Sequence, residues 1–480
     1  MRFAMPRLRR TAVVAVAALV TLAACSIKLP NVTLQGSGGG GTTGTGLTTG
    51  TTTGTAGTGL TTGATTGTAG TGALPNANDT SCVGKVTDTG VTGSEIKLGS
   101  TFAYSGPVSS ISGPILKGVQ SYFNKVNDSG GVFGRKINLV WYDDGWDAQK
   151  GKAFIKKLVE QDHVFILSVV PSSNGLDAAT SYLESRQMPV LGSSGLIESQ
   201  FHSPMIWPVG TSTKSATRVQ MLYMRQTNVQ NAAIIYLDLL AGTEALDAFR
   251  NGIKPIFGKD PADFITSTQR VSIGEGDYGS VWARIASDTS SWQANHHQTV
   301  DGRPDFVLFA IDPTSAISAL QAAQQKGFSP KKGWGGGQPL YLSVIAQNGY
   351  ADTTRLVAGT SYYPPQMQAQ VPAVRDYIAT VQRYYGSSVD VTNPYLEGGY
   401  AGAALTIEAM RRVGSCLTKN KVIQVADHFS EFSPAGLTRP LTYVSGNHYG
   451  NLSYLLAQLD ASGQWHVITS WLTDPTPGAA

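Results

Sequence analysis

Short apolar runs alternate with amphipathic stretches between residues 96 and 327. The apolar runs have the length and composition of strands, and the stretches between them repeat their apolar positions at helical spacing. Strict alternation of this kind predicts parallel sheets flanked by helices, an α/β fold. The predicted strands are 96–102, 136–142, 164–170, 189–191, 232–237, 264–271 and 305–310. The predicted helices are 115–126, 148–161, 178–186, 218–227, 243–253, 281–287 and 316–327.

The amino-terminal segment has a different pattern. Several arginines precede an apolar stretch at 11–24, which is shorter than a transmembrane helix requires. The stretch ends in Leu22-Ala23-Ala24-Cys25, which is similar to a bacterial lipobox. We expect residues 1–24 to be a lipoprotein signal peptide and Cys25 to carry a lipid that anchors the chain to the cell membrane, at the cell surface or in the periplasm. An ordinary secretory signal with a chance cysteine is the alternative.

Residues 36–72 consist almost entirely of Gly and Thr. Such a segment has too little apolar surface to offset its chain entropy, which predicts disorder. We expect 25–89 to be a lipidated amino-terminus followed by a flexible tether. Flexible-coil scaling gives the Gly/Thr stretch a reach of roughly 35 Å. A neutral spacer expanded by repetition is an equally good interpretation.

Charge and motifs exclude several classes of function. The chain has 36 Lys and Arg against 32 Asp and Glu, and part of this small excess lies in the amino-terminal segment, so we expect no nucleic-acid partner. The run 274–279 fits a GxGxxG pattern, but no acidic ribose ligand follows it, and no P-loop, HExxH or G-x-S-x-G motif is present. His296-His297 has no partners at metal spacing. The sequence therefore predicts neither an enzyme, nor a cofactor, nor a metal site.

Two cysteines remain once Cys25 is assigned to lipidation. In an exported protein Cys82 and Cys416 lie in an oxidising compartment. A single disulfide between them is the economical prediction, and two free buried thiols are the alternative.

An ordered series of motifs spans residues 91 to 210 and continues near the carboxyl terminus. These motifs include Val91-Thr92-Gly93, Tyr104-Ser105-Gly106-Pro107, the turn at 126–137, Tyr142-Asp143-Asp144 and the later run 395–403. In this order the chain resembles the leucine/isoleucine/valine-binding type of periplasmic binding protein, the ligand receptor of ABC importers. The resemblance implies a two-lobe type I (Venus-flytrap) fold with a three-stranded hinge. It also implies a monomer that captures a small solute and passes it to a membrane permease.

The resemblance further implies a division of the chain into lobes. Residues 90–212 and 338–437 are expected to form lobe 1, and residues 213–337 and 438–474 lobe 2. Three crossovers between them would form the hinge. A ligand-sensing or structural surface lipoprotein without an importer is the alternative function.

The candidate ligand contacts lie in loops that follow predicted strands, where parallel sheets bind ligands. Hydroxyls and free N–H groups at the start of a helix suit a carboxylate, although helix capping is the ordinary use of Ser at such places. Asp312 is expected either to close over the ligand or to cap the helix that follows it. The candidates are Tyr104, Ser105, Ser172, Ser173, Ser193, Ser194, Gly195, Asp238, Asp312 and Tyr363.

Two departures from the family pattern bear on the ligand. Relatives that bind α-amino acids usually carry a hydroxyl residue where this chain has Gly195, and an acidic residue in the loop that here reads 342–345. An uncompensated ammonium in a closed cleft is costly. Either Asp312 or Asp238 supplies the missing charge, or the ligand is a carboxylate, an amide or a short peptide and not a free amino acid.

Overall fold

The computed structural model describes residues 74–106, 108–347 and 353–478. The predicted signal peptide, the predicted lipidation site Cys25 and the whole Gly/Thr-rich segment lie outside these residues. None of the helices that the structure describes is long and apolar enough to span a membrane.

The first of two sheets is entirely parallel, with the strand order β2-β1-β3-β4-β5. Strands β3, β4 and β5 are buried along their whole length, because helices cover both sides of the sheet, whereas the edge strand β2 exposes Lys136 and Asn138. The strands are β1 Glu95–Phe102, β2 Lys136–Asp143, β3 Ile166–Ser168, β4 Val190–Ser193 and β5 Ile206–Pro208.

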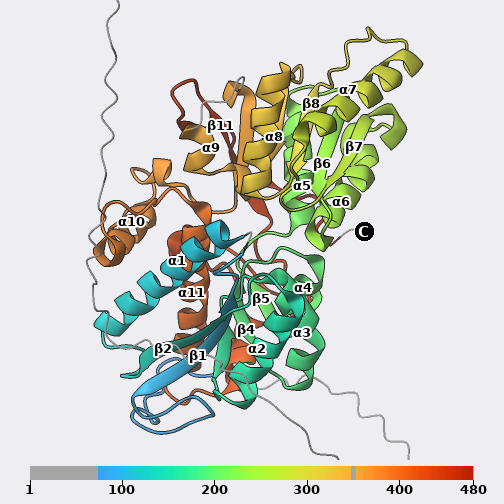
Figure 1. Cartoon of the computed structure of the whole chain (residues 1–480). Coiled ribbons are helices and arrows are strands. Elements are labelled where there is room, and N and C mark those ends of the chain that lie inside the picture. The colour runs from blue at the N-terminus through green and yellow to red at the C-terminus, as the bar shows by residue number, and fades with distance from the viewer. Residues whose placement is uncertain (1–73, 107, 348–352, 479–480) are drawn as a thin grey trace, which may run out of the picture. The chain divides into compact units, whose positions relative to one another are not determined.

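The second sheet follows the order β12-β11-β10-β9-β8-β6-β7, with β13 also paired to β11. It is parallel from β7 to β10, and β11 joins it antiparallel. The strands are β6 Ala232–Leu237, β7 Ile265–Val271, β8 Phe306–Ala310, β9 Gly333–Gly336, β10 Leu356–Thr360, β11 Ser453–Leu459, β12 Trp465–Val467 and β13 Leu472–Thr473. The two sheets with their helices form a first and a second lobe (Figure 1), so the predicted α/β fold with parallel sheets flanked by helices is confirmed.

The helices pack on both sheets and bury their apolar faces in the cores of the two lobes. They are α1 Ser109–Asp128, α2 Ala148–Glu160, α3 Ser173–Ser185, α4 Glu198–His202, α5 Thr213–Gln226, α6 Leu240–Phe257, α7 Tyr278–Asn295, α8 Pro313–Lys326, α9 Ser343–Gln347, α10 Pro372–Tyr385, α11 Pro394–Val413 and α12 Lys419–Ala426. Short 3-10 helices are η1 Pro261–Asp263, η2 Gln338–Leu340, η3 Thr353–Arg355, η4 Pro365–Met367 and η5 Pro434–Gly436.

The chain crosses between the lobes near residues 209, 361 and 451. The side-chain amide of Asn451 lies at this junction and donates to the carbonyl oxygens of Val209 and Ser361, each at 3.3 Å. The second crossover comes later than the boundary expected at 338, because β10 pairs between β9 and β11 in the second sheet. The third also comes later than 438, because Tyr443 still packs in the first core and donates to the carbonyl oxygen of Pro208 at 2.6 Å.

The segment before β1 is tied to the first lobe by Cys82 and Arg135. A disulfide joins Cys82 to Cys416, the pairing proposed from the sequence. The fully buried guanidinium of Arg135 donates to the carbonyl oxygens of Cys82 at 2.6 Å and Lys85 at 3.0 Å. These contacts hold the segment from Cys82 onward against the first lobe, so the prediction of a flexible tether reaching residue 89 is wrong for this part of the chain.

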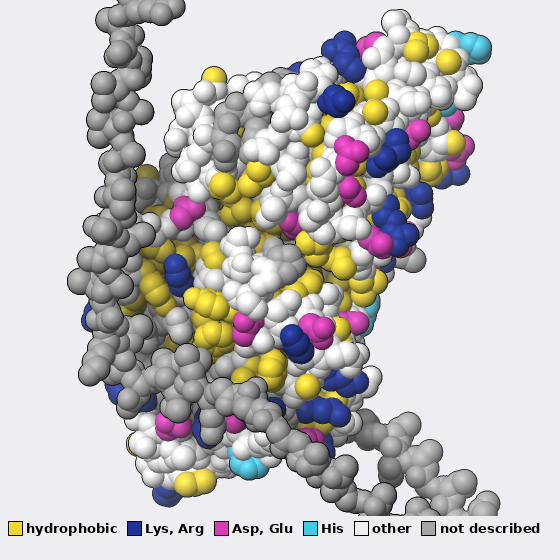
Figure 2. Space-filling model, viewed as in Figure 1, with side chains coloured by type: hydrophobic (Ala, Val, Ile, Leu, Met, Phe, Trp, Pro, Cys, Tyr) yellow, Lys and Arg dark blue, Asp and Glu magenta, His cyan; other side chains and the backbone are white. Residues whose placement is uncertain are grey.

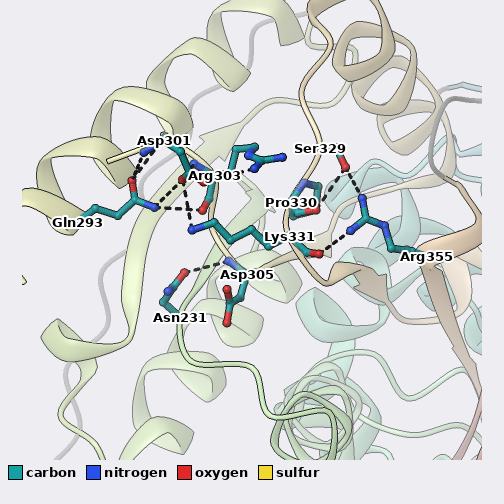
Figure 3. Close-up of polar contacts among 10 residues, drawn as sticks. Asn231, Gln293, Asp301, Arg303, Asp305, Ser329, Pro330, Lys331 and Arg355 are labelled. Atoms are coloured by element: carbon teal, nitrogen blue, oxygen red, sulfur yellow. Dashed lines mark hydrogen bonds and ion pairs between the residues drawn. The ribbon is translucent and has the colours of Figure 1, made fainter. Parts of the chain in front are cut away.

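A polar cluster holds loops at the amino ends of the strands of the second sheet (Figure 3). Asp301 accepts from the amide of Gln293 at 2.8 Å and pairs with Lys331 at 3.3 Å. Partial burial opposes ionisation of Asp301, but hydrogen bonds from Gln293 and the Arg303 N–H, with the Lys331 ammonium, lower its pKa to about 2. The carboxyl ends of the same strands carry no comparable ion cluster among the described residues, and they face the first lobe.

Candidate ligand-binding site

A cavity lies between the two lobes, at the carboxyl ends of strands from both sheets. The first lobe contributes the loops after β3 and β4, and the second lobe contributes the loops after β6, β8 and β9. Parallel strands end at one edge of a sheet, so loops far apart in the sequence meet there. Figure 2 shows hydrophobic side chains gathered where the lobes meet, while charged side chains lie mainly over the outer surfaces.

Three of the residues predicted from the sequence line this cavity. Ser173 and Ser194 reach it from the first lobe, and Asp312 reaches it from the second. Each follows the end of a parallel strand, which is the signal that selected them. The structure thus brings together side chains from opposite lobes.

Ser172 and Ser193 lie behind the cavity rather than on its wall. Both side chains are fully buried, and their hydroxyls have no hydrogen-bond partner among the described residues. Ser172 is the N-cap residue of α3 without donating or accepting through its side chain. Buried Asp144 lies beside Ser172, and burial raises the pKa of this carboxyl.

Asp312 serves as the N-cap of α8 and also lines the cavity. Its Oδ1 accepts the backbone N–H groups of Thr314 and Ser315, both at 3.0 Å. Its Oδ2 is buried and has no hydrogen-bond partner among the described residues. The capping interpretation is therefore confirmed, and the same side chain also lines the cavity, where contact with a ligand stays a prediction.

Asp238 does not line the cavity and is not placed to receive a ligand ammonium. It forms an ion pair with Arg270 of the neighbouring strand, on an exposed surface. Strand register explains this position, because Tyr236 and Arg270 pair across β6 and β7 and so bring the Arg270 side chain beside the end of β6.

Three other predicted contacts also lie away from the cavity wall. Tyr104 is half exposed and packs against Trp141, with ring centroids 5.5 Å apart. The backbone N–H of Ser105 donates to Asp143 at 3.1 Å, which holds that loop against the end of β2. Tyr363 packs edge-on against Trp471, whereas its neighbour Tyr362 lines the cavity.

Gly195 adopts a backbone conformation that excludes a hydroxyl residue. Its φ is +67°, and a Cβ atom there would lie 2.6 Å from Cβ of Pro208 and 2.8 Å from Cζ of Phe201. Gly195 does not line the cavity, although Ser194 beside it does. The local packing is therefore the reason that this position carries no side chain.

Sequence reasoning missed several cavity residues. Trp146, Gln220, Gln338, Tyr395 and Tyr454 all line the cavity. Gln338 follows β9, a glycine-rich strand that the apolar pattern does not reveal, whereas Gln220 reaches the cavity from within α5. The loop after β2 was a usable signal for Trp146, because it follows a predicted strand.

The phenols in this region are neutral. Burial raises the pKa of Tyr362, Tyr395 and Tyr454 far above the usual range, and neighbouring phenols or carboxylates raise the first two further. Among the described lining residues, Asp312 is the single carboxylic acid, and Lys, Arg and His are absent. The cavity is thus a largely apolar space with few polar groups at its edges, the usual form of a small-molecule site.

The sequence model of the periplasmic binding protein family matches residues 95–464. This match covers the first sheet, the strands β6 to β11 of the second sheet and every segment that lines the cavity. The chain belongs to the periplasmic binding protein family, which confirms the resemblance seen in its motifs. Members of this family are substrate-binding proteins that act outside the cytoplasm, and the family is not an enzyme class.

Individual relatives are distant. The Leu/Ile/Val-binding protein of Escherichia coli (strain K12) is 23% identical over 212 residues, which are 40% of this chain and 52% of that protein. The chain thus spans about half the length of the curated relatives it matches.

Solved structures show the same fold at low identity. A fatty acid ABC transporter substrate-binding protein from Thermomonospora curvata is 18% identical with a TM-score of 0.66, over 81% of this chain and 95% of that one. A solute-binding protein of an ABC transporter from R. palustris, in complex with benzoate, is 15% identical with a TM-score of 0.64, over 80% and 99%.

Proposed function

We propose that this protein is the extracytoplasmic receptor of an ABC importer. It captures a small amphipathic solute between its lobes and delivers it to a membrane permease. The cavity carries this proposal, because its lining comes from both lobes and a ligand there contacts both at once. Similar proteins are named for branched-chain amino acids, for a fatty acid and for a complex with benzoate.

Binding in such a cavity favours a closed arrangement of the lobes. A ligand shifts a conformational equilibrium by its difference in affinity for the two states. The first lobe offers Ser173 and Ser194 to the acceptor end of the ligand, and the second lobe adds contacts around Asp312. Closure then presents a surface that a permease distinguishes from the unliganded form.

Binding and closure are tested together with a pool of amino acids, carboxylates and amides. Thermal shift identifies ligands from the pool, and small-angle X-ray scattering then measures compaction. Removing a hydroxyl that is bonded to a charged group costs about 1.5–3 kcal/mol, so Ser173→Ala with Ser194→Ala lowers affinity by at least about a hundredfold. Ser193→Ala is the matched control, since that buried hydroxyl lies off the cavity wall.

The proposal fails if bound ligand leaves the scattering profile unchanged. If the double variant binds as tightly as the parent, the assigned contacts at Ser173 and Ser194 are wrong, because the ligand then binds elsewhere. Deleting the gene for this protein should abolish uptake of the identified solute by intact cells.

Membrane attachment through Cys25 is part of the same proposal. The Leu22-Ala23-Ala24-Cys25 sequence supports it, with a following segment long enough to hold the lobes away from the membrane. Cys25→Ala should release the protein from the membrane fraction or leave the signal peptide uncleaved. A variant that fractionates and migrates like the parent would show that the lipobox interpretation is wrong.

A further inference from the structure

We infer that the ligand is a hydrophobic monocarboxylate, an aliphatic or aromatic acid without an α-amino group. The inference rests on the proposed function, because it names the ligand class of the same cavity. Three properties of the cavity lead to it. Hydrogen-bond donors lie on the first lobe, and apolar walls lie on both lobes. On the second lobe, the Oδ1 atom of Asp312 already accepts two backbone N–H groups of α8.

Hydrogen-bond donors face the cavity from the first lobe. Ser173 and Asn174 form the first turn of α3, where backbone N–H groups have no acceptor within the helix. The hydroxyl of Ser194 lies on the neighbouring loop, and the indole N–H of Trp146 is buried without a hydrogen-bond partner among the described residues. A helix N-terminus beside hydroxyl and indole donors stabilises a carboxylate without a cationic side chain.

The remaining walls are apolar on both lobes. The first lobe contributes Ile111, Ile115 and Ile197, and the second contributes Leu237, Ile273 and Phe309. Closure removes these walls and the ligand's hydrocarbon surface from water at the same time, so each methylene of the ligand adds affinity. Sugars and other highly hydroxylated solutes would leave most of their polar groups without partners here.

The second lobe engages one oxygen of Asp312 without a ligand, while Oδ2 has no hydrogen-bond partner among the described residues. Its Oδ1 accepts two N–H groups of α8, and its charge lies at the positive end of that helix. The hydroxyls of Ser315 and Tyr278 lie in the same buried corner as Oδ2. Burial raises the pKa of Tyr278 to about 12, with the Asp312 charge adding to the effect, so this phenol stays a donor.

A ligand ammonium therefore has a single acidic partner among the described lining residues, the Oδ2 atom of Asp312. Next to Asp312 it would also meet the positive end of α8, and no other acidic side chain lines the cavity among the described residues. Enclosing an ammonium under these conditions weakens binding greatly. A neutral amide carries no negative charge for the helix N-terminus to stabilise, so it binds more weakly than a carboxylate. A hydrophobic acid without an amino group places its carboxylate at the donors of the first lobe and its hydrocarbon part against the apolar walls.

The test compares four molecules that share an eight-carbon skeleton. Octanoate, octanamide, octylamine and 2-aminooctanoic acid are titrated into the purified full chain by isothermal calorimetry. Octanoate should bind about tenfold or more tightly than the other three, since charge-assisted hydrogen bonds are the stronger ones. Octanoate should also bind roughly fifteenfold more tightly than hexanoate, because each buried methylene contributes about fourfold. Replacing octanoate by 3-phenylpropanoate separates aliphatic from aromatic preference.

Two variants locate the carboxylate. Ser173→Ala should weaken octanoate binding about tenfold. Asp312→Asn keeps an oxygen to cap α8 and removes a like charge, so it should strengthen octanoate binding by about two- to threefold. Asp277→Asn is the matched control, because Asp277 caps α7 in the same way but does not line the cavity.

The outcomes separate this inference from the proposed function. Tighter binding of 2-aminooctanoic acid than of octanoate, lost on Asp312→Asn, overturns the inference and leaves a receptor of amino acids. Tighter binding of octanamide or octylamine overturns it as well. If none of the four binds, the hydrophobic acid is rejected, and the closure experiment with the wider pool still decides whether the protein is a receptor.

Discussion

Glu244 of α6 lies where the second lobe touches the first. Its two carboxylate oxygens each accept the backbone N–H of Glu198 at 3.2 Å, and Tyr449 donates to the side chain of the same Glu198. Burial raises the pKa of Glu244 to about 7, and the nearby negative charge of Glu198 adds to the effect. This contact between the lobes therefore changes its charge within the physiological pH range.

The raised pKa makes stability depend on pH in a definite direction. Between pH 4.5, the ordinary value, and about 7, folded Glu244 holds a proton that the unfolded chain has released. Its contribution to stability therefore declines as pH rises through this window and is constant above it. Glu244→Gln should remove this decline and raise the melting temperature above the parent's at pH 8, but not at pH 4.5.

Thermal unfolding from pH 4.5 to 8 measures the effect. Glu431→Gln, at an exposed site, is the control for the chemical change alone. Parallel pH profiles for the parent and Glu244→Gln would show that Glu244 does not titrate in this window.

At the scale of elements, α1 and α11 pack at backbone distance through glycines. A Cβ atom at Gly118 would lie 2.0 Å from the carbonyl oxygen of Leu396, and one at Gly399 would lie 2.1 Å from that of Ile115. Both helices also reach the cavity, which Ile115 of α1 and Gly398 of α11 line. The Gly399-Tyr400-Ala401 sequence in the late motif is thus explained by helix contact rather than by ligand contact.

Gly118→Ala should lower the free energy of unfolding by about 1–3 kcal/mol, because the added methyl meets backbone that cannot retreat. Gly113→Ala in the same helix meets nothing within 4 Å and should be neutral or stabilise by up to about 1 kcal/mol. Urea unfolding measures the change in the free energy of unfolding for both variants. Equal effects at the two positions would contradict the close packing of α1 on α11.

At the scale of the whole molecule, the lobes are coupled through the three crossovers. Asn451 is 2% exposed and bonds to the other two crossovers through one amide nitrogen. Residues of both lobes also line the cavity between them. Asn451 therefore ties the three crossovers together at the hinge.

Asn451→Leu should weaken that coupling. It leaves the carbonyl oxygens of Val209 and Ser361 without their shared donor, at a cost of about 1–3 kcal/mol. We expect urea unfolding to broaden or to split into two transitions, one for each lobe, with ligand affinity reduced. Asn295→Leu, at an exposed helix end, is the control, and an unchanged single transition in Asn451→Leu would contradict the role of the hinge.

The sequence by itself determined the alternation of elements and therefore the fold class. Predicted strands such as 232–237 agree with the structure because buried parallel strands are continuous apolar runs. The predicted starts of some helices lie several residues too late, because polar N-cap residues and prolines interrupt the apolar pattern in the first turns of those helices. Helix α1 begins at Ser109 although Pro114 lies inside it, and α8 begins directly after its cap, Asp312.

Only the tertiary structure decided which strand-end residues share the cavity. Ser173, Ser194 and Asp312 reach its wall, whereas Ser172 and Ser193, one residue earlier, point behind it. Neighbouring residues at a strand end project to different sides, so a loop identified correctly still leaves the choice of side chain open. Asp238 forms an ion pair with Arg270, which lies 32 residues later in the sequence and is brought near only by the pairing of β6 with β7. Local sequence patterns determine elements, but contacts between distant segments determine the site.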